Sequence, residues 1–177
     1  MESSELARFE AVILPHLDAG YTLARYLIRD DHDAEDVTQE ACLRALRYFG
    51  GFRGGEEGSA RAWLLAIVRN TAYSWRHRAG GGRDETEFDE TEHSGAIADR
   101  NPEATMLRQD ARESFRRMLD RLPPEFREVI VLREIQGLSY KEIGEVAGVP
   151  VGTVMSRLSR ARDRLAEALR SEEGEER

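Results

Sequence analysis

Residues Gly137–Leu169, GLSYKEIGEVAGVPVGTVMSRLSRARDRLAEAL, decide the fold of this chain. Ser139, with Glu142 three residues later, forms the capping-box pattern, in which a hydroxyl and a carboxylate satisfy free backbone N–H groups at a helix start. The helix that this pattern predicts over 140–147 stops at Gly148-Val149-Pro150, which predicts a tight turn. A second helix is predicted after the turn, because apolar residues recur at three- and four-residue steps, namely Val154, Leu158, Ala161, Leu165 and Leu169.

The face of the second helix opposite that stripe is small, polar and basic. Its small residues let the backbone approach base edges, Arg160 is long enough to reach guanine, and the other arginines can reach phosphates. This arrangement predicts a helix-turn-helix that reads a DNA major groove. The other interpretation is an ordinary antiparallel helical pair with a solvated basic face. The residues assigned to DNA reading are Gly152, Thr153, Ser156, Arg157, Ser159, Arg160 and Arg164.

The formal net charge of −8 is concentrated in one segment of the 177 residues. Between Ala79 and Asp110 nine acids outnumber three arginines, which leaves −6, whereas 60–83 contains five arginines and no acid. Basic patches beside a separate acidic connector are compatible with a nucleic-acid partner. The net negative charge of the chain also predicts that the protein alone binds DNA weakly, because the DNA affinity of a free protein comes largely from Lys and Arg side chains that neutralise phosphates.

Composition excludes several protein classes. The chain has no run of about 18 apolar residues, and its acidic, polar start is unlike a signal peptide, so it is predicted to be cytoplasmic without membrane insertion. A single cysteine, Cys42, excludes an internal disulfide and is expected to be a small core residue. Four scattered histidines form no zinc pattern. No nucleophile–base pair or phosphate-cradling glycine motif is found, so neither an enzyme nor a cofactor is expected.

The N-terminal third is predicted to be helical. Two helical pieces over 6–30 are interrupted near Pro15, and Asp33 is a good N-cap for a helix over 34–49. Leu43 stands in the middle of the polar half of that helix, and it is either an ordinary exposed leucine or the anchor of a protein-binding surface. The polar residues around it are Asp36, Gln39, Glu40, Arg44 and Arg47.

A glycine-rich loop over 50–58 precedes a helix predicted from Ala60 to Arg78, with Ser59 as its cap. Arginines interleaved with an aromatic ring and an amide on its outer face suit single-stranded or melted nucleic acid, where bases stack on rings and phosphates meet arginines. The alternative is a solvated face with a half-buried tyrosine. The outer-face residues are Arg69, Asn70, Tyr73, Arg76 and His77, with Trp63 at one edge.

The C-terminal part adds two further helices before the helix-turn-helix. Asn101-Pro102 is a cap and a first helical residue, and the apolar stripe that follows begins with Leu107 and Ala111. Pro123-Pro124 ends that helix and starts another, whose apolar set ends at Ile135. The fold is therefore predicted to be all-α, with two small helical domains, 1–78 and 105–177, joined by a flexible acidic linker over 79–104.

Three motifs, in this order and at this chain length, make the sequence resemble the extracytoplasmic-function (ECF) group of bacterial RNA polymerase sigma factors, in the sigma-70 family. The resemblance covers nearly the whole chain, although the third motif is partly shared with other helix-turn-helix regulators. The motifs are DAEDVTQEACLRAL (33–46), FRGG with ARAWLLAIVRNTA (within 52–72), and LPPEFREVIVLREIQGLSYKEIGEVAGVPVGTVMSRLSRARDRL (122–165).

The resemblance implies a non-enzymatic subunit that binds core polymerase, recognises the −35 and −10 promoter elements and promotes DNA melting. The helix-turn-helix would read the −35 element, and its domain is expected to contact the polymerase β flap. Phe52 and Arg53 would capture a flipped −10 base. The opened −10 strand would run along Trp63, Arg69, Asn70, Tyr73, Arg76 and His77. The clamp helices of the β′ subunit would bind Asp36, Gln39, Glu40, Leu43 and Arg47.

The sequence departs from the commonest pattern of the group at two points. Met155, on the DNA-reading face, stands where members often carry Lys or Arg, so one phosphate or base contact is expected to be missing. The loop after Phe52 carries a Gly-Glu-Glu-Gly insertion, so the resemblance does not specify which base this loop would capture. No folded extension is expected after Leu169, only a short acidic tail over 171–177. This favours control by a separate anti-sigma protein wedged between the two domains.

The main alternative is a stand-alone helix-turn-helix regulator that dimerises on operators. Such a protein needs a sensor or dimerisation domain before its DNA-binding part. Residues 1–78 instead offer a docking face and a helix with arginines and aromatic rings.

Overall fold

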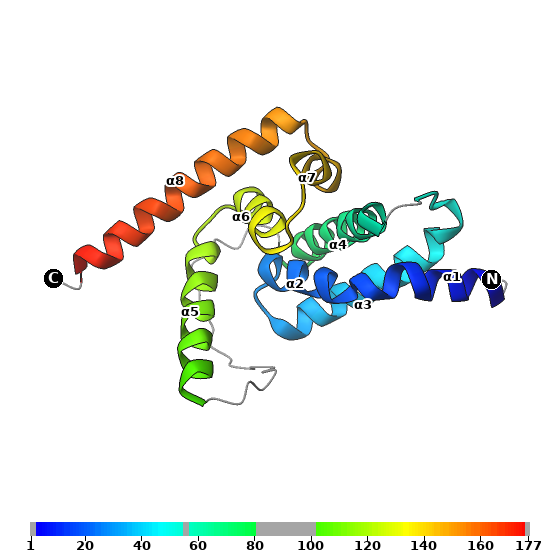
Figure 1. Ribbon diagram of the computed structural model, residues 1–177, viewed down its shortest axis with the longest axis horizontal. Helices are drawn as coiled ribbons and strands as arrows, with labels where there is room; N and C mark the ends of the chain where they lie inside the picture. The colour runs from blue at the N-terminus through cyan, green and yellow to red at the C-terminus, as the bar shows by residue number, and fades with distance from the viewer. Residues whose placement is uncertain (1–2, 55–56, 81–101, 176–177) are drawn as a thin grey trace.

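Helices supply all the regular structure in the described part of the chain, residues 3–54, 57–80 and 102–175 of a computed structural model (Figure 1). The predicted all-α fold with two helical domains is confirmed. The predicted linker falls mostly on 81–101, which lies outside the described residues. The elements are α1 (Ser3–Ile13), η1 (Leu14–His16), α2 (Leu17–Leu27), α3 (Asp31–Tyr48), η2 (Phe49–Gly51), α4 (Glu57–Gly80), α5 (Pro102–Asp120), α6 (Pro124–Ile130), η3 (Val131–Ile135), α7 (Tyr140–Ala147) and α8 (Val151–Glu175).

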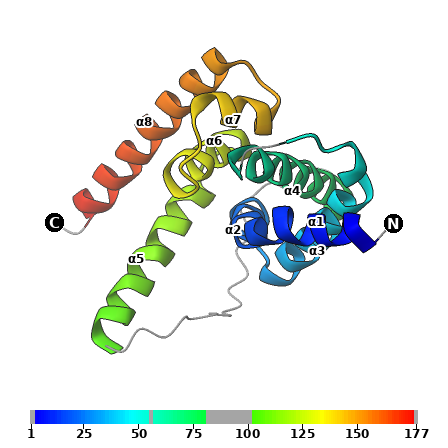
Figure 2. The same cartoon turned by 45° about the vertical axis from the view of Figure 1, so that its right-hand side comes forward.

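The N-terminal domain packs α2, α3 and α4 together, with α1 against α4 (Figure 2). The predicted interruption near Pro15 is confirmed, because the short 3₁₀ turn η1 separates α1 from α2. Gly20 lets α2 approach α4 closely, since a Cβ at this position would lie 3.2 Å from Cγ2 of Val68. The core of this domain includes Phe9, Ile13, Leu23, Leu27, Val37, Phe49, Leu64, Leu65 and Val68.

Two predicted helix caps in this domain are wrong. Asp30 caps α3 in place of Asp33, because its carboxylate accepts a hydrogen bond from the backbone N–H of Asp33. The earlier start puts Asp31 and Asp33 in the first turn, where negative charge interacts favourably with the helix dipole. Helix α4 begins at Glu57, so Ser59 lies inside the helix and does not precede it.

The predicted helix-turn-helix is confirmed in α7 and α8. The Ser139 hydroxyl accepts from the Glu142 N–H at 3.2 Å, and the Glu142 carboxylate accepts from the Ser139 N–H at 2.7 Å, which completes the capping box. Gly148 ends α7 with a φ of 68°, in the left-handed region that favours glycine. The turn then folds back so tightly that a Cβ on Gly144 would lie 2.8 Å from the carbonyl oxygen of Val149.

Several apolar residues predicted to be buried are exposed. Leu107 is 71% exposed, and Ala111, Ile135 and Leu169 are also exposed. The N-terminal end of α5 and the C-terminal end of α8 project away from the rest of the molecule (Figure 1), so the ends of their apolar stripes face solvent. Helix α8 also continues to Glu175, through most of the segment that the sequence predicted to be a tail.

The two domains pack against each other, with α4 against α7 and α2 against α5 and α6 (Figures 1 and 2). Many of the hydrogen bonds that cross this interface run from long polar side chains to backbone carbonyls. Arg29 donates to Asp120 O at 3.0 Å, Arg116 donates to Arg29 O at 3.0 Å, and Gln136 donates to Ala19 O at 3.1 Å. Such a polar interface is typical of domains that can move relative to each other.

A buried guanidinium joins the start of the C-terminal domain to α2. Arg127 of α6 is 1% exposed and donates to three carbonyls near the end of α5, those of Leu119, Asp120 and Leu122, at 3.0–3.1 Å. It also donates to Tyr26 O, at the end of α2, at 3.2 Å. The last carbonyls of a helix lack donors within the helix, and a cation there is favourable for the helix dipole. One side chain therefore satisfies the ends of two helices in different domains.

We expect Gly144→Ala to destabilise the protein by about 1–3 kcal/mol, because its Cβ must displace the backbone of the turn. Gly152→Ala is the matched control. A Cβ at Gly152 meets nothing within 4 Å in the described structure, so alanine there should leave stability unchanged or raise it by about 0.5–1 kcal/mol. Urea unfolding followed by circular dichroism measures both variants. Equal stability of the two variants would contradict the tight turn.

Candidate nucleic-acid interface and protein-docking face

One face of α3 is open to solvent and carries the residues assigned to docking. Leu43 is 65% exposed, and Asp36, Gln39 and Arg47 on the same side of the helix are exposed as well. Glu40 is less exposed, because Arg44 and Arg78 both form ion pairs with it. A large apolar side chain in water, ringed by polar groups, is the arrangement expected of a protein-binding anchor.

Phe52, which the resemblance assigned to base capture, is a buried residue in this conformation. It is 6% exposed, and its ring centre lies 4.8 Å from that of Trp63 and 5.7 Å from that of Phe49, on which it stacks. Arg53, the next residue, is exposed. The aromatic cluster therefore fixes the loop before α4 and leaves Arg53 at the surface beside it.

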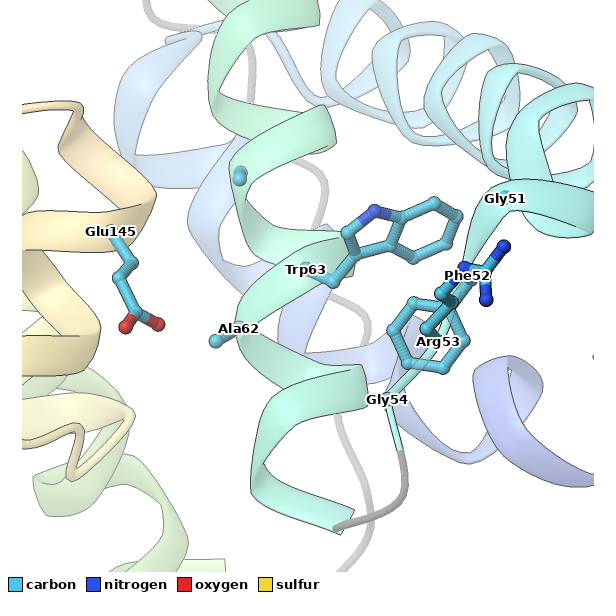
Figure 3. Close-up of a pocket in the computed structure, with 8 residues that line it drawn as sticks. Gly51, Phe52, Arg53, Gly54, Ala62, Trp63 and Glu145 are labelled. Carbon is cyan, nitrogen blue, oxygen red and sulfur yellow. The ribbon is translucent and has the colours of Figure 1, made fainter.

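An open pocket of about 460 Å³ lies between this loop and α4 (Figure 3). Small side chains on α4 leave the space, aromatic rings form one wall, and an arginine stands at the edge. Figure 3 shows the carboxylate of Glu145, from α7 of the other domain, pointing toward Ala62, on the other side of the α4 ribbon from the rings of Phe52 and Trp63. The residues that line the pocket are Gly51, Phe52, Arg53, Gly54, Ala62, Trp63, Ala66 and Glu145.

The outer face of α4 is only partly exposed, contrary to the prediction. Arg69 donates two hydrogen bonds to Glu128 of α6, from Nε to Oε2 at 3.0 Å and from Nη2 to Oε1 at 3.3 Å. Its guanidinium lies 4.2 Å above the ring centre of Tyr73, and its Nη1 donates to Asn70 Oδ1 at 3.3 Å. Arg76 is also partly covered, whereas Asn70 and His77 are exposed. Two of the predicted strand-binding residues, Arg69 and Tyr73, therefore lie together beside Glu128 of the C-terminal domain.

The protonation equilibria on this face follow from burial and from Glu128. Burial alone lowers the pKa of Arg69, but the hydrogen bonds and the charge of Glu128 outweigh it, so the pKa of Arg69 is raised. Burial raises the pKa of Tyr73, and the nearby Glu128 carboxylate raises it further. Arg69 is therefore held as a cation and Tyr73 as a neutral phenol near neutral pH.

Sequence reasoning missed Glu128, the centre of this cluster. Its side chain is 0% exposed, and Arg157 Nη1 of α8 lies 3.9 Å from its Oε1, so an arginine from each domain meets one carboxylate. Removal of a carboxylate from water is costly unless it is paired. The only signal in the sequence was the charged pair Arg127-Glu128 within an apolar segment. The same pattern is equally typical of residues on the exposed face of an amphipathic helix, so it does not predict that Glu128 is buried.

The predicted DNA-reading face of α8 is largely exposed. Its apolar stripe, Val154, Leu158 and Ala161, is buried beneath it. The guanidinium of Arg164 lies 5.0 Å from the ring centre of Phe126. Thr153 and Arg157 are partly covered. The exposed members of the face are Gly152, Met155, Ser156, Ser159, Arg160 and Arg164.

Within the described ranges, no group of three or more His, Cys, Asp or Glu side chains is placed to hold a metal ion. None of the described helices is long and apolar enough to cross a membrane. Cys42 is partly buried against the core, and burial raises the pKa of its thiol.

Comparison with known proteins relates these surfaces to one family. The family models "Sigma-70 region 2" and "Sigma-70, region 4" match residues 12–81 and 112–165. The RNA polymerase sigma-H factor of Pseudomonas aeruginosa is 35% identical over 171 residues, which cover 91% of this chain and 86% of that protein. The chain belongs to the ECF group of the sigma-70 family. It is an RNA polymerase sigma factor and serves promoter recognition.

Other sigma factors are similar in sequence and in structure. The ECF sigma-E factor of Escherichia coli is 39% identical over 137 residues, 74% of this chain and 71% of that protein. The structure of the sigma factor RpoE from Bartonella quintana, in complex with the anti-sigma factor NepR, matches with a TM-score of 0.72 and 29% identity over 92% of this chain and 97% of that chain. The match covers residues of both domains.

We expect Phe52→Ala to lower the stability of this sigma factor by about 3 kcal/mol, because it removes the ring that packs on Phe49 and Trp63. The exposed neighbour provides the control, since Arg53→Ala should change stability by less than about 0.5 kcal/mol. Thermal unfolding followed by Trp fluorescence measures both. If Phe52→Ala leaves the stability unchanged, the aromatic cluster does not hold the loop in place.

Proposed function

We propose that this sigma factor docks on the clamp helices of the polymerase β′ subunit through α3. The observation that carries the proposal is the 65% exposure of Leu43 on an otherwise polar face. Burial of one leucine at a partner's surface contributes about 2 kcal/mol. The charges of Asp36 and Arg47 beside it, with Gln39 and the ion-paired Glu40, would fix the orientation of the partner.

The pocket beside Phe52 and Trp63 is assigned to a flipped base of the −10 element. Its volume lies in the range of small-molecule sites, and aromatic walls favour stacking of a base. Flipping a base out of a duplex costs a few kcal/mol, and the cost falls once the strand has melted. A preformed pocket therefore favours the melted state. The rest of the opened strand would follow α4, along Arg69, Asn70, Tyr73, Arg76 and His77.

The helix-turn-helix is assigned to the −35 element as duplex DNA. The small residues Gly152 and Ser156 near the start of α8 are exposed and leave room for base edges, while Arg160 is placed to reach a guanine. Met155 is exposed on the same face and supports an apolar contact in place of a charged one. The same domain is proposed to contact the polymerase β flap, so that both elements are read from one polymerase-bound subunit.

We further propose that an anti-sigma factor controls this protein, and that it acts in the cytoplasm as a non-enzymatic subunit. The similarity to RpoE, whose structure is that of a complex with the anti-sigma factor NepR, supports the first part. The relatives named as RNA polymerase sigma factors support the second, because such a subunit acts where the polymerase is.

The decisive experiment is in vitro transcription by purified core polymerase on a promoter library, with and without the protein. We expect protein-dependent start sites that share two short upstream elements. Tight binding of duplex DNA by the protein alone, without redirection of the core enzyme, would instead support a stand-alone helix-turn-helix regulator.

Leu43→Glu should weaken binding to core polymerase by about 2 kcal/mol or more, roughly thirtyfold, because it replaces an apolar anchor with a charge. Leu169→Glu is the matched control, since Leu169 is also an exposed leucine on a helix but lies at the far end of α8. Fluorescence anisotropy with labelled protein and purified core measures both affinities. Equal affinities of the two variants would exclude this face of α3 as the docking site.

Arg160→Ala should reduce transcription from promoters that depend on the −35 element by about tenfold, the effect of losing one bidentate base contact. Arg162→Ala serves as the control on the same helix. Arg162 forms an ion pair with Glu134 at 2.7 Å, and exposed pairs of this kind contribute little to stability. Unchanged promoter choice by Arg160→Ala would contradict this docking of α8.

A further inference from the structure

The loop that lines the base pocket is held by α1 as well as by the aromatic cluster. Nη2 of Arg8 donates a hydrogen bond to the backbone carbonyl of Phe52 at 3.3 Å, although the two residues are 44 positions apart. The same guanidinium lies 4.9 Å from the ring centre of Phe49, within the range of a cation–π contact. One side chain of α1 therefore contacts both the backbone of the loop and the rings on which the loop packs.

A second residue of α1 approaches the same loop. Glu5 lies three residues before Arg8, so the two side chains share one face of the helix. A Cβ on Gly50 would lie 3.1 Å from Oε1 of Glu5, so this carboxylate lies close to the start of the loop. Phe9 anchors α1, because it is 3% exposed and its ring meets that of Phe49 edge-on at 5.3 Å. The helix that contacts the loop is therefore itself fixed in the core.

Arg8 fixes the orientation of a peptide group beside the pocket. The backbone N–H of Phe52 donates to Phe49 O at 2.9 Å, so both polar backbone groups of Phe52 are held. Because a peptide group is planar, a fixed carbonyl of Phe52 also fixes the direction of the N–H of Arg53. These two residues line the pocket, and glycines flank them in the sequence. Glycine has the most freely rotating backbone, so the orientation of this peptide depends on the contacts that hold it.

We propose that Arg8 is a positioning residue for base choice, because it holds the carbonyl of Phe52 and with it the geometry that distinguishes the captured base from the others. The inference rests on the proposed function of this pocket as the site of a flipped −10 base. Polar groups at fixed places discriminate between bases, since a wrong base leaves them unpaired. A loop that is free to shift pairs with several bases, so removal of Arg8 lowers the discrimination.

A direct contact with a DNA phosphate is the other role open to an exposed arginine such as Arg8. Positioning is favoured because the guanidinium is already engaged by the carbonyl of Phe52 and the ring of Phe49. The carboxylate of Glu5 on the same face of α1 also disfavours a phosphate there, since like charges repel. The two roles differ in their effect, because a phosphate contact strengthens binding of every sequence alike and is sensitive to salt.

The first measurement concerns the free, full-length protein. Arg8→Ala should leave the fold intact, because Arg8 is exposed and Phe9 and Ile13 keep α1 in the core. Amide hydrogen exchange over 49–54 should become about tenfold faster, as expected when one hydrogen bond to a charged group is lost. Arg170→Ala is the matched control. It removes the same charge from an exposed position near the end of α8, far from α1 (Figure 1), and should leave this exchange unchanged.

The second measurement concerns the complex with core polymerase. Open-complex formation is compared between a promoter found with the promoter library and versions of it that carry each single base change in the −10 element. Arg8→Ala should lower the preference for the best base over the next, at the most discriminating −10 position, by about tenfold. Affinity for core polymerase, discrimination at the −35 element and the salt dependence of promoter binding should not change. Arg170→Ala should keep the wild-type preference.

Three results would overturn the role of Arg8. Unchanged hydrogen exchange over 49–54 would show that α1 does not hold the loop. Faster exchange with an unchanged base preference would show that the contact has no effect on base choice. A uniform loss of affinity across the −10 variants, with the salt slope reduced by about one, would assign Arg8 to a phosphate instead.

Failure of the proposed function is distinguishable from failure of this inference. It would be seen as wild-type protein that does not direct core polymerase, or that shows no base preference at any −10 position. Hydrogen exchange reports the contact between α1 and the loop without DNA or polymerase.

Discussion

Two adjacent buried charges on α6 hold the rest of the structure in place. Arg127 and Glu128 are both almost fully excluded from water, and the effective cost of burying an ion is several kcal/mol. Each is stable because its partners converge from separate elements. Carbonyls at the ends of α5 and α2 accept from Arg127, and guanidinium groups of α4 and α8 surround Glu128. A helix of seven residues thus joins both domains by electrostatics as well as by packing.

The distribution of charge along the sequence explains why the arginines of α4 form ion pairs with other elements of the same chain. Residues 60–83 contain arginines but no acid, so the arginines of α4 must find carboxylates on other elements. Arg69 finds Glu128 and Arg78 finds Glu40. A surface made to bind phosphates is for the same reason a surface that binds carboxylates, because a guanidinium recognises both by the same fork. The carboxylates that pair with these arginines of α4 come from the protein itself.

The sequence predicted local structure reliably where the residues that interact lie within one short segment. The capping box of Ser139 and Glu142, the left-handed Gly148 and the break near Pro15 each depend on residues within one turn. Neighbouring candidates were harder to separate, since Asp30 and Asp33 are equally good N-caps and the structure uses Asp30. The periodicity of apolar residues correctly predicted that α5 is a helix with an apolar stripe along one side. It does not tell whether another helix covers that stripe, and Leu107 remains in water.

By itself, therefore, the sequence determined the helices, the helix-turn-helix, the family and the isolated leucine on α3, because hydrophobic period, caps and motifs are local properties of the chain. Only the tertiary structure decided that Arg69 and Tyr73 lie beside Glu128 of the C-terminal domain, that Glu128 is buried and that Glu145 is among the residues lining the pocket with Phe52 and Trp63. Arg69 and Glu128 are 59 residues apart. Side chains on one helix meet only at separations of three or four, so no local pattern pairs such distant residues until the two domains pack.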